Sequence, residues 1–453
     1  MKNTKNPWSW IPTLYFAEGL PYVLVMTVSV IMYKNLGISN TEIAFYTSWL
    51  YLPWVIKPFW SPFVDLLKTK RWWITTMQLL IGAGLAGIAF FLPTSFFFQA
   101  TLAVFWLMAF SSATHDIAAD GFYMLALNES EQSLFVGIRN IFYRIATITG
   151  QGLLIVLAGM LANGTLINYL NWLIVKIHIQ DYTLLYPLTR FIEESIEVLA
   201  YFHENIPYSW SLVFFACAGL FIAIGLYHTY QLPKPTTDKG ASLGSLGNLF
   251  KTFFQKKGIV LSLAFILLYR LGEAQLAKLA SPFLLDKPEM GGLNLSTEQV
   301  GIIYGTIGVI ALLLGGIVGG IVASKHGLKK WLWYMVAAMN VPNLVYVYLA
   351  FVQPENLWVI SSCVAIEQLG YGFGFTAFML YLIYVAQGPY QTAHYAICTG
   401  FMALGMMLPG MIAGWLQEMM GYDWFFVWVC LCTIPGIILA GFLPIPKDFG
   451  KKK

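Results

Sequence analysis

Two carboxylic acids and a histidine stand close together inside a long apolar run. Residues 111–127 read SSATHDIAADGFYMLAL and carry His115, Asp116 and Asp120. A charged side chain at membrane depth is costly, so it usually faces a protein interior or a water-filled path. In a helix, Asp116 and Asp120 share one face. Two neighbouring carboxylates raise each other's proton affinity, so the pair predicts a proton relay or a contact with polar cargo.

The same aspartates have a second interpretation as members of static ion pairs. Arg139 and Arg144 lie in the next apolar segment, and either could neutralise one of them. Arg144, which follows Tyr143, could instead hold the carboxylate or phosphate of an anionic cargo through two hydrogen bonds. Both interpretations require the guanidinium to face inward, and both stay open at this point.

Charged residues also occur in the first two apolar segments. Glu18 begins the run Glu-Gly-Leu-Pro, in which Pro21 weakens the helix and frees backbone groups to line a cavity. Lys57 lies deep enough in the second segment to reach that cavity. Asp65 ends this segment next to several basic residues, and we expect it to act with Arg139 at a cytoplasmic gate.

The second half of the chain holds a smaller set of polar candidates. Arg270 and Glu273 are three residues apart in the seventh apolar segment, so they could contact cargo or pair with each other. Glu367 and Gln368 open a glycine-rich run in the tenth segment. We count these four residues with Glu18, Lys57 and the residues above as candidates for cargo binding or proton coupling.

Other kinds of site are disfavoured. His115 and Asp120 form the His-x4-Asp pattern of some acyltransferases, but a catalytic base needs access to two substrates, and this pair lies inside a spanning segment. The five cysteines show no metal-ligand spacing, and the glycines at 370–374 follow no predicted strand. We therefore expect no catalytic residue, no metal and no cofactor.

The composition is that of a protein with many membrane spans. Hydrophobic residues make up 58% of the 453 residues and charged residues 11%, against roughly 25% charged residues in soluble domains. Apolar segments of about 20 residues recur along the whole chain. The twelve predicted spans are residues 12–32, 43–63, 72–92, 97–125, 135–161, 210–230, 258–284, 300–323, 331–351, 357–385, 396–420 and 424–443.

The placement of charge predicts the topology. Most of the 26 Lys and Arg residues fall in loops on the side of the two termini, which the positive-inside rule assigns to the cytoplasm. The net charge of +4 therefore reflects topology and gives no reason to expect a nucleic-acid partner. We expect a multi-pass protein in the lipid bilayer with both termini in the cytoplasm.

One long basic loop divides the chain. Residues 231–257 separate six predicted spans from six, which is the pattern of transporters built from two related bundles. The predicted domains are a six-helix bundle at 1–230 and another at 258–453. Residues 162–209 form an external insertion of the first bundle. Within it, apolar residues at helical spacing over 188–199 predict an amphipathic helix on the membrane or over the pore mouth, with 166–177 as its partner.

Several motifs carry a family resemblance. They are EGLP at 18–21, KPFWSPFVD at 57–65, DIAAD at 116–120, YR at 143–144, YRLGEA at 269–274, EQLGYGFG at 367–374 and AGW at 413–415. In order and spacing the chain resembles the AmpG-type muropeptide permease family, in the peptide, acetyl-coenzyme A and drug uptake branch of the major facilitator superfamily.

The resemblance implies an all-helical major facilitator fold and proton-driven uptake across the bacterial inner membrane. The implied cargo is peptidoglycan fragments, amino sugars bearing N-acetylmuramic acid with or without a peptide. Many members have a Trp-Lys-Thr-Asp run where this chain has FYML at 122–125. Two polar side chains are therefore replaced near the predicted site. Another anionic metabolite such as acetyl-coenzyme A or a peptide stays an alternative cargo, and a membrane acyltransferase or a non-transporting receptor are alternatives of other classes.

Overall fold

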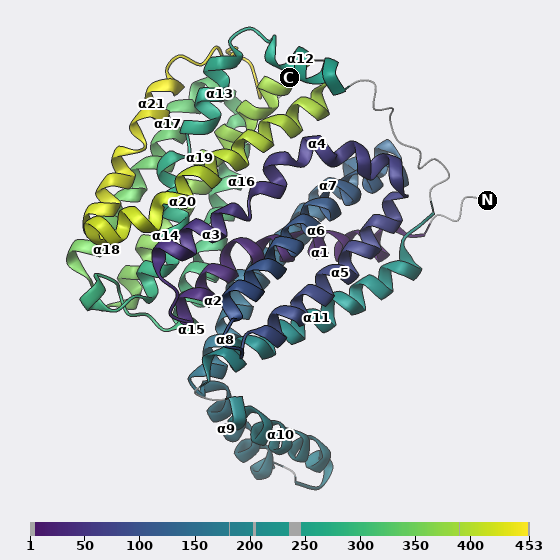
Figure 1. The fold of residues 1–453 in the computed structure, drawn as a ribbon, viewed down its shortest axis with the longest axis vertical. Helices are drawn as coiled ribbons and strands as arrows, with labels where there is room; N and C mark the ends of the chain where they lie inside the picture. The colour runs from purple at the N-terminus through teal and green to yellow at the C-terminus, as the bar shows by residue number, and fades with distance from the viewer. Residues whose placement is uncertain (1–4, 181, 203–204, 235–245, 389, 452–453) are drawn as a thin grey trace.

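The computed structural model describes residues 5–180, 182–202, 205–234, 246–388 and 390–451, and within these ranges it consists of helices and loops with no strand (Figure 1). Ten helical stretches are long and apolar enough to cross a membrane. Helices suit this environment because each satisfies its own backbone hydrogen bonds. The predicted all-helical, multi-pass class is therefore confirmed.

The first half of the chain contains nine helices that pack around the site. They are α1 (Ile11–Val23), α2 (Ser29–Asn35), α3 (Asn40–Trp49), α4 (Leu52–Leu67), α5 (Lys70–Phe91), α6 (Phe97–Ala126), α7 (Glu129–Ile148), α8 (Ile155–Ala162) and α11 (Ile206–Gln231). Within this group α5 packs between α6 and α11, and α1 packs on α7.

The second half forms another group beside the first (Figure 1). Its helices are α12 (Leu246–Phe254), α13 (Ile259–Leu268), α14 (Leu271–Leu285), α15 (Thr297–Ile302), α16 (Val309–His326), α17 (Leu328–Asn340), α18 (Leu344–Val352), α19 (Leu357–Ala386), α20 (Gln391–Leu431) and α21 (Ile434–Ala440). Here α16 and α17 pack on α19, and α14 packs on α20. The division into domains at 230 and 258 stays a prediction.

The ten apolar stretches match the predicted spans with two differences. The predicted span at 43–63 is not among them, because these residues form two helices, α3 and α4, separated near Leu50. The last stretch, Ala393–Ala440, covers the final two predicted spans. The backbone leaves helical geometry inside it at Gly421, where φ is 79°, close to the predicted break. The count of twelve spans stays a prediction.

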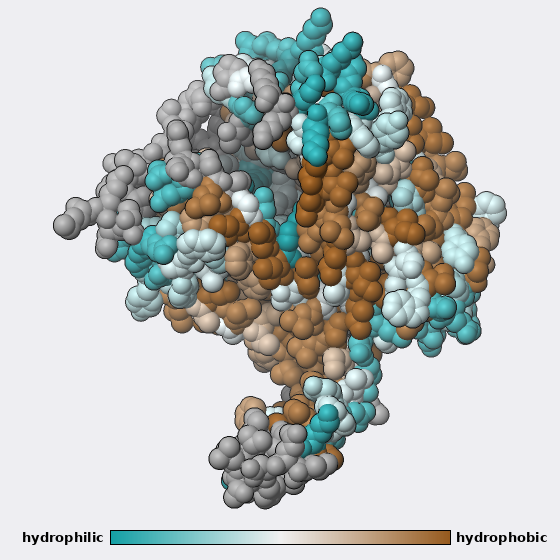
Figure 2. All heavy atoms as spheres, turned by 180° about the vertical axis from the view of Figure 1, so that it is seen from behind, coloured by the Kyte–Doolittle hydropathy of each residue, from teal (hydrophilic) through white to brown (hydrophobic). Residues whose placement is uncertain are grey.

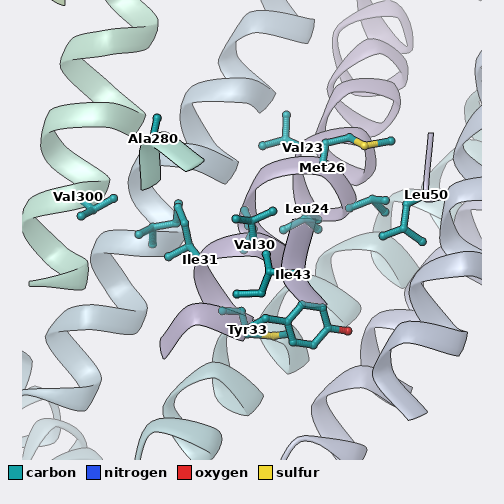
Figure 3. Close-up of a cluster of buried hydrophobic side chains, with 14 of the residues drawn as sticks. Val23, Leu24, Met26, Val30, Ile31, Tyr33, Ile43, Leu50, Ala280 and Val300 are labelled. Carbon is teal, nitrogen blue, oxygen red and sulfur yellow. The ribbon is translucent and has the colours of Figure 1, made fainter. Parts of the chain in front are cut away.

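The two groups meet along an apolar core. α3 and α4 pack against α20, α2 against α14, and α8 against α15. Figure 3 shows side chains of α1, α2 and the π-helical segment between them, among them Val30 and Ile31, next to Ala280 of α14 and Val300 of α15. All four side chains are at most 3% exposed.

Irregular helix geometry occurs at the level of this contact. π-helical segments interrupt the helices at Leu24–Val28, Thr149–Leu154 and Ile303–Gly308. The first follows Pro21 closely, where the sequence predicts a weakened helix. The second and third pack against each other, and a Cβ atom at Gly305 would lie 1.6 Å from the carbonyl oxygen of Gln151. Glycine therefore allows the two groups to touch backbone to backbone.

The insertion forms a helical hairpin. α9 (Thr165–Gln180) contains the predicted partner segment at 166–177, and α10 (Tyr182–Phe202) contains the predicted helix at 188–199. The two helices pack on each other and project from the rest of the molecule beyond α8 (Figure 1). Its predicted position on the membrane or over the pore mouth stays a prediction.

Candidate functional site

A cavity of about 870 Å³ lies between the two groups of helices. Figure 2 shows a hollow entering the molecule between its two lobes. The charged side chains that line the cavity are Lys57, Lys70, Asp116, Asp120, Arg144, Arg270, Glu273 and Lys278. Five of these eight carry a positive charge and three a negative charge, so the cavity favours an anionic ligand.

The first half contributes a carboxylate cluster, which we define as Glu18, Asp116 and Asp120 with the cations Lys57 and Arg139. One carboxylate oxygen from each of the three acids lies within 4.8 Å of the other two. Lys57 of α4 forms an ion pair with Asp116 of α6, and Arg139 of α7 forms one with Asp120 at 3.0 Å. The predicted Asp120–Arg139 pair is present, whereas Asp116 pairs with Lys57 and not with an arginine of α7.

Glu18 is the acid of this cluster without a cation of its own. Its Oε2 atom is buried and has no hydrogen-bond partner among the described residues. Three acids at this spacing could also ligate a metal ion. Two of them already have a cationic partner, however, and the geometry therefore favours ion pairing over metal binding.

Arg139 of α7 contacts side chains of two other helices in the first half. Its guanidinium donates to the hydroxyl of Tyr15 at 3.1 Å and lies 5.2 Å from the centre of that ring and 5.1 Å from that of Tyr123. These partners belong to α1 and α6, so Arg139 does not bridge the two groups in this conformation. The side chain of Asp65, the other predicted gate residue, lies outside the described residues.

Arg144 and Tyr143 both line the cavity. In the described part of the chain Arg144 forms no ion pair, since Asp116 and Asp120 are held by other cations. Of the two interpretations from the sequence, the neutralisation of Asp116 by Arg144 is therefore wrong for this conformation. The guanidinium is left facing the cavity.

The second half contributes Arg270 at a break in the seventh span. Its φ of −104° and ψ of 18° place it between α13 and α14. It donates to the hydroxyl of Tyr371 at 2.5 Å and lies 5.0 Å from the ring centre of Phe375. The expected pair with Glu273 is not among the ion pairs of the described residues. The three-residue spacing of a continuous helix does not hold across this break.

Two predicted acids of the second half, Glu273 and Glu367, are buried and form no ion pair among the described residues. Glu273 lines the cavity and Glu367 lies behind it, and each has a buried carboxylate oxygen with no partner in the described structure. Gln368 lines the cavity and donates to Glu367 at 3.0 Å. The structure thus brings Glu273 and Gln368 to the cavity and leaves Glu367 one layer further out.

Several lining residues are absent from the sequence predictions. The most notable is Lys278, whose position inside an apolar segment was a signal for it. Tyrosines are harder to assign from sequence, because they also anchor spans at the membrane interface. The further polar or aromatic lining residues are Tyr22, Tyr51, Trp54, Gln151, Tyr304, Tyr371 and Tyr395.

His115 belongs to a different network. Its Nε2 atom lies 2.9 Å from Gln78, whose Oε1 atom lies 2.8 Å from Nδ1 of His228. His115 is 1% exposed and is not among the residues that line the cavity. It ties α6 to α5 and α11 and has no access to a substrate in the cavity, so the acyltransferase interpretation lacks its catalytic base.

The cavity is closed at one end by polar contacts between the two groups. We call this the sealed end and define it by Lys34, Asn40, Asp286, Gln417 and Tyr422. Lys34 forms an ion pair with Asp286 at 2.6 Å. Asn40 donates to Gln417 at 2.7 Å and to Tyr422 at 2.8 Å. The sealed end is the one nearer α8, α9 and α10, which the topology prediction assigns to the outside.

At the opposite end the lining residues come from the last turn of α6 and the first turns of α5 and α20, among them Met124, Leu125, Lys70 and Tyr395. α11 ends and α12 begins at this end of the molecule (Figure 1). The arrangement is that of a carrier closed on one side, with its charged centre reachable from the other.

Known proteins resemble this chain in sequence. A sequence model of the BT1 family matches residues 17–181. The anhydromuropeptide permease of Escherichia coli is 25% identical over 445 residues, which cover 94% of this chain and 77% of the relative. A Rickettsia conorii protein that carries the name AmpG 4 is 25% identical over 451 residues, which cover 95% of this chain and 94% of that protein.

The fold also matches solved structures. The crystal structure of the nucleoside transporter NupG superposes with a TM-score of 0.68 at 14% sequence identity, covering 96% of this chain and 98% of the other. A bacterial homologue of the human lysosomal transporter Spinster, solved in an inward-facing and unoccupied conformation, gives a TM-score of 0.62 at 14% identity. These matches confirm the major facilitator fold.

Taken with the charged cavity, the matches confirm the resemblance to AmpG-type permeases that the motifs indicate. The chain is a multi-pass membrane transporter of small molecules and not an enzyme.

Proposed function

We propose that this AmpG-type transporter takes up peptidoglycan fragments that contain N-acetylmuramic acid, together with protons, across the bacterial inner membrane. The observation that carries the proposal is the unequal pairing of charge in the cavity. The acids Asp116 and Asp120 are held by cations of their own half, whereas Arg144 and Arg270 face the cavity without a carboxylate partner among the described residues.

The two arginines fit the chemistry of this cargo. The lactyl group of N-acetylmuramic acid and the ends of its peptide are carboxylates, which guanidinium groups bind with charge-assisted hydrogen bonds. Tyr22 and Trp54, whose ring centres are 5.2 Å apart, offer aromatic faces in the same cavity. The volume of about 870 Å³ lies in the range of roughly 300–1,000 Å³ that is typical of sites for small organic ligands.

The carboxylate cluster supports proton coupling. A proton that reaches Glu18, Asp116 or Asp120 reduces the repulsion among three acids held within 4.8 Å. On Asp116 or Asp120 the proton also weakens an ion pair, which changes how α4, α6 and α7 are held together. Protons therefore bind to the carboxylate cluster and cargo binds to the arginines of the same cavity, as coupled transport requires.

In this proposal the sealed end faces the outside and both termini lie in the cytoplasm. Cargo and proton enter while the sealed end is open, the contacts around Asn40 then re-form, and the cargo leaves at the opposite end. The two groups of helices act as the two bundles that rock about the cavity, as in other carriers of this architecture.

The test is uptake by purified protein in proteoliposomes under an imposed pH gradient, with a radiolabelled disaccharide that contains N-acetylmuramic acid. We expect gradient-stimulated uptake that a protonophore abolishes. A matched disaccharide without the lactyl carboxylate is expected to be a poor cargo. Equal uptake of both sugars would contradict carboxylate recognition.

Another anionic metabolite remains a second candidate cargo, because FYML at 122–125 replaces polar residues found in many permeases of this type. Acetyl-coenzyme A and a free peptide belong in the same assay as competitors. Strong competition by either one, together with no uptake of the muramic acid sugar, would replace the proposed cargo.

A further inference from the structure

Lys278 is a buried cation that the proposed function does not yet use. It lies in α14, is 4% exposed and lines the cavity. Its ammonium group donates to Thr47 Oγ1 at 2.9 Å and lies 5.3 Å from the ring centre of Tyr51. No ion pair to Lys278 exists in the described part of the chain. A buried charge without a charged partner is unfavourable, and its retention points to a ligand.

The partner of Lys278 comes from the other group of helices. Thr47 belongs to α3 and donates its own hydroxyl hydrogen to the carbonyl oxygen of Ile43 at 2.6 Å. A hydroxyl has one hydrogen to donate, so this bond leaves only its lone pairs for Lys278. Thr47 thus offers the ammonium one neutral acceptor, which is a weaker partner than a carboxylate.

The helices of Thr47 and Lys278, α3 and α14, also contribute to the sealed end. Asn40 lies seven residues before Thr47 on α3, and Asp286 lies eight residues after Lys278 at the end of α14. Asn40 donates to Asp286 at 3.3 Å. With a rise of about 1.5 Å per residue, the two contacts are roughly 10–12 Å apart along one helix pair. Separation of α3 from α14 at the sealed end therefore breaks both contacts.

A third helix packs closely on the stem of Lys278. α20 crosses over it at Gly410, where a Cβ atom would lie 2.7 Å from Ser48 Oγ and 3.3 Å from Lys278 Cγ. In this conformation Thr47 accepts one of the three hydrogens of the ammonium group, so it competes with a cargo anion for Lys278. When the sealed end is closed, Lys278 is therefore hydrogen-bonded to Thr47.

We propose that Lys278 binds an anionic group of the cargo while the sealed end is open, and that Thr47 displaces this group when the sealed end closes. This inference rests on the proposed function and adds a residue that sets specificity and a means of cargo release. With the sealed end open, α3 has moved away and Lys278 is a cation in need of an anion. Once Thr47 returns, the cargo loses that contact and its affinity falls on the side where it must leave.

The test compares Lys278→Met with Lys278→Arg in proteoliposomes. The probes are the N-acetylmuramic acid disaccharide and its lactyl amide, which lacks the negative charge. For the acid, we expect Lys278→Met to raise the KM of influx about 10–100-fold, the value of a charge-assisted hydrogen bond, and Lys278→Arg to restore part of it. For the amide, the KM is expected to be the same in all three proteins. Equal changes for acid and amide would assign Lys278 a structural role and overturn the inference.

Thr47→Val and its matched control Thr47→Ser test the displacement step. Thr47→Val keeps the shape and removes the acceptor, so we expect tighter cargo binding in the inward-facing state and slower release, seen as a lower KM for efflux with a lower turnover. Thr47→Ser is expected to behave as wild type. Identical kinetics of the two variants would contradict displacement.

Uptake by the wild-type protein distinguishes a failure of the proposed function from a failure of the role proposed for Lys278. If the wild-type protein does not transport the muramic acid disaccharide, the proposed function fails. If it does, and the Lys278 and Thr47 variants share its KM values, only the role of Lys278 fails.

Discussion

The two halves of the cavity carry similar residues and arrange them differently. In the first half, Lys57 and Arg139 are each paired with an aspartate. In the second half, Arg270 is bonded to a tyrosine and Lys278 to a threonine, while Glu273 forms no ion pair in the described part of the chain. The three neighbouring acids of the first half repel one another, which suits this cluster to accept a proton. Cations that have only neutral partners are suited to binding an anion.

The largest expected effect concerns the first half. Asp116→Asn removes one carboxylate from the carboxylate cluster, so we expect accumulation against a gradient to be lost while exchange of cargo across the membrane continues. Gradient-driven uptake and counterflow measured on the same proteoliposomes give both values. The double variant Lys57→Gln/Asp116→Asn is the control, since it leaves no unpaired ammonium. Full gradient-driven uptake by Asp116→Asn would exclude Asp116 from coupling.

The second-largest expected effect is a loss of cargo affinity when Arg270 of the second half is replaced. Arg270→Gln removes a cation that faces the cavity, and we expect the KM for an anionic cargo to rise about 10–100-fold with little change in the dependence on the pH gradient. Arg270→Lys should restore part of the affinity, because the charge remains but the two-pronged geometry does not. If Arg270→Gln abolishes proton coupling and leaves the KM unchanged, the division of roles between the halves is wrong.

A smaller effect is expected from the partner of Arg270. Tyr371→Phe deletes the hydroxyl that accepts from the guanidinium at 2.5 Å and keeps the ring beneath it. Because the charge stays in the cavity, the KM should rise only about 2–10-fold, the range of a single ordinary hydrogen bond. Transport kinetics with the acid and amide cargoes measure it. A loss as large as that of Arg270→Gln would mean that the tyrosine itself contacts the cargo.

The smallest effect is one of stability. In a double-mutant cycle, Asp120→Asn and Arg139→Gln are expected to show a coupling free energy of about 0.5–1 kcal/mol, because the pair is partly exposed. The same cycle on Arg270→Gln and Glu273→Gln should give a smaller value, since these residues form no ion pair in the described part of the chain. Thermal unfolding in detergent measures both cycles. A larger coupling for the second cycle than for the first would reverse the comparison.

Much of the architecture follows from hydropathy alone. Apolar segments separated by charged loops predict α6 and α19 to within one residue at each end and α5 to within two, because a spanning helix must be long and apolar. The predicted second span differs because α3 and α4 are two helices that pack against α20 in the other half. Proline and charge within this segment lower its hydropathy, and its stability comes from tertiary contacts that hydropathy does not report.

The members of the site were easier to predict than their partners. Charge in an apolar segment identified Asp116, Asp120, Arg144 and Arg270, each of which lines the cavity. The partner of Asp116 is 59 residues away on α4, and that of Lys278 is 231 residues away on α3. Such pairs depend on the rotation of each helix about its axis and on the height at which helices meet. Both properties are set by packing across the whole protein.

The most direct test of the account measures protons and cargo together. Proteoliposomes held at zero membrane potential, with a pH-sensitive dye inside, receive the N-acetylmuramic acid disaccharide outside. The account predicts that cargo entry acidifies the lumen in wild-type protein and in Arg270→Lys, and that Asp116→Asn abolishes the acidification. Entry of cargo into wild-type proteoliposomes with no movement of protons would contradict the account.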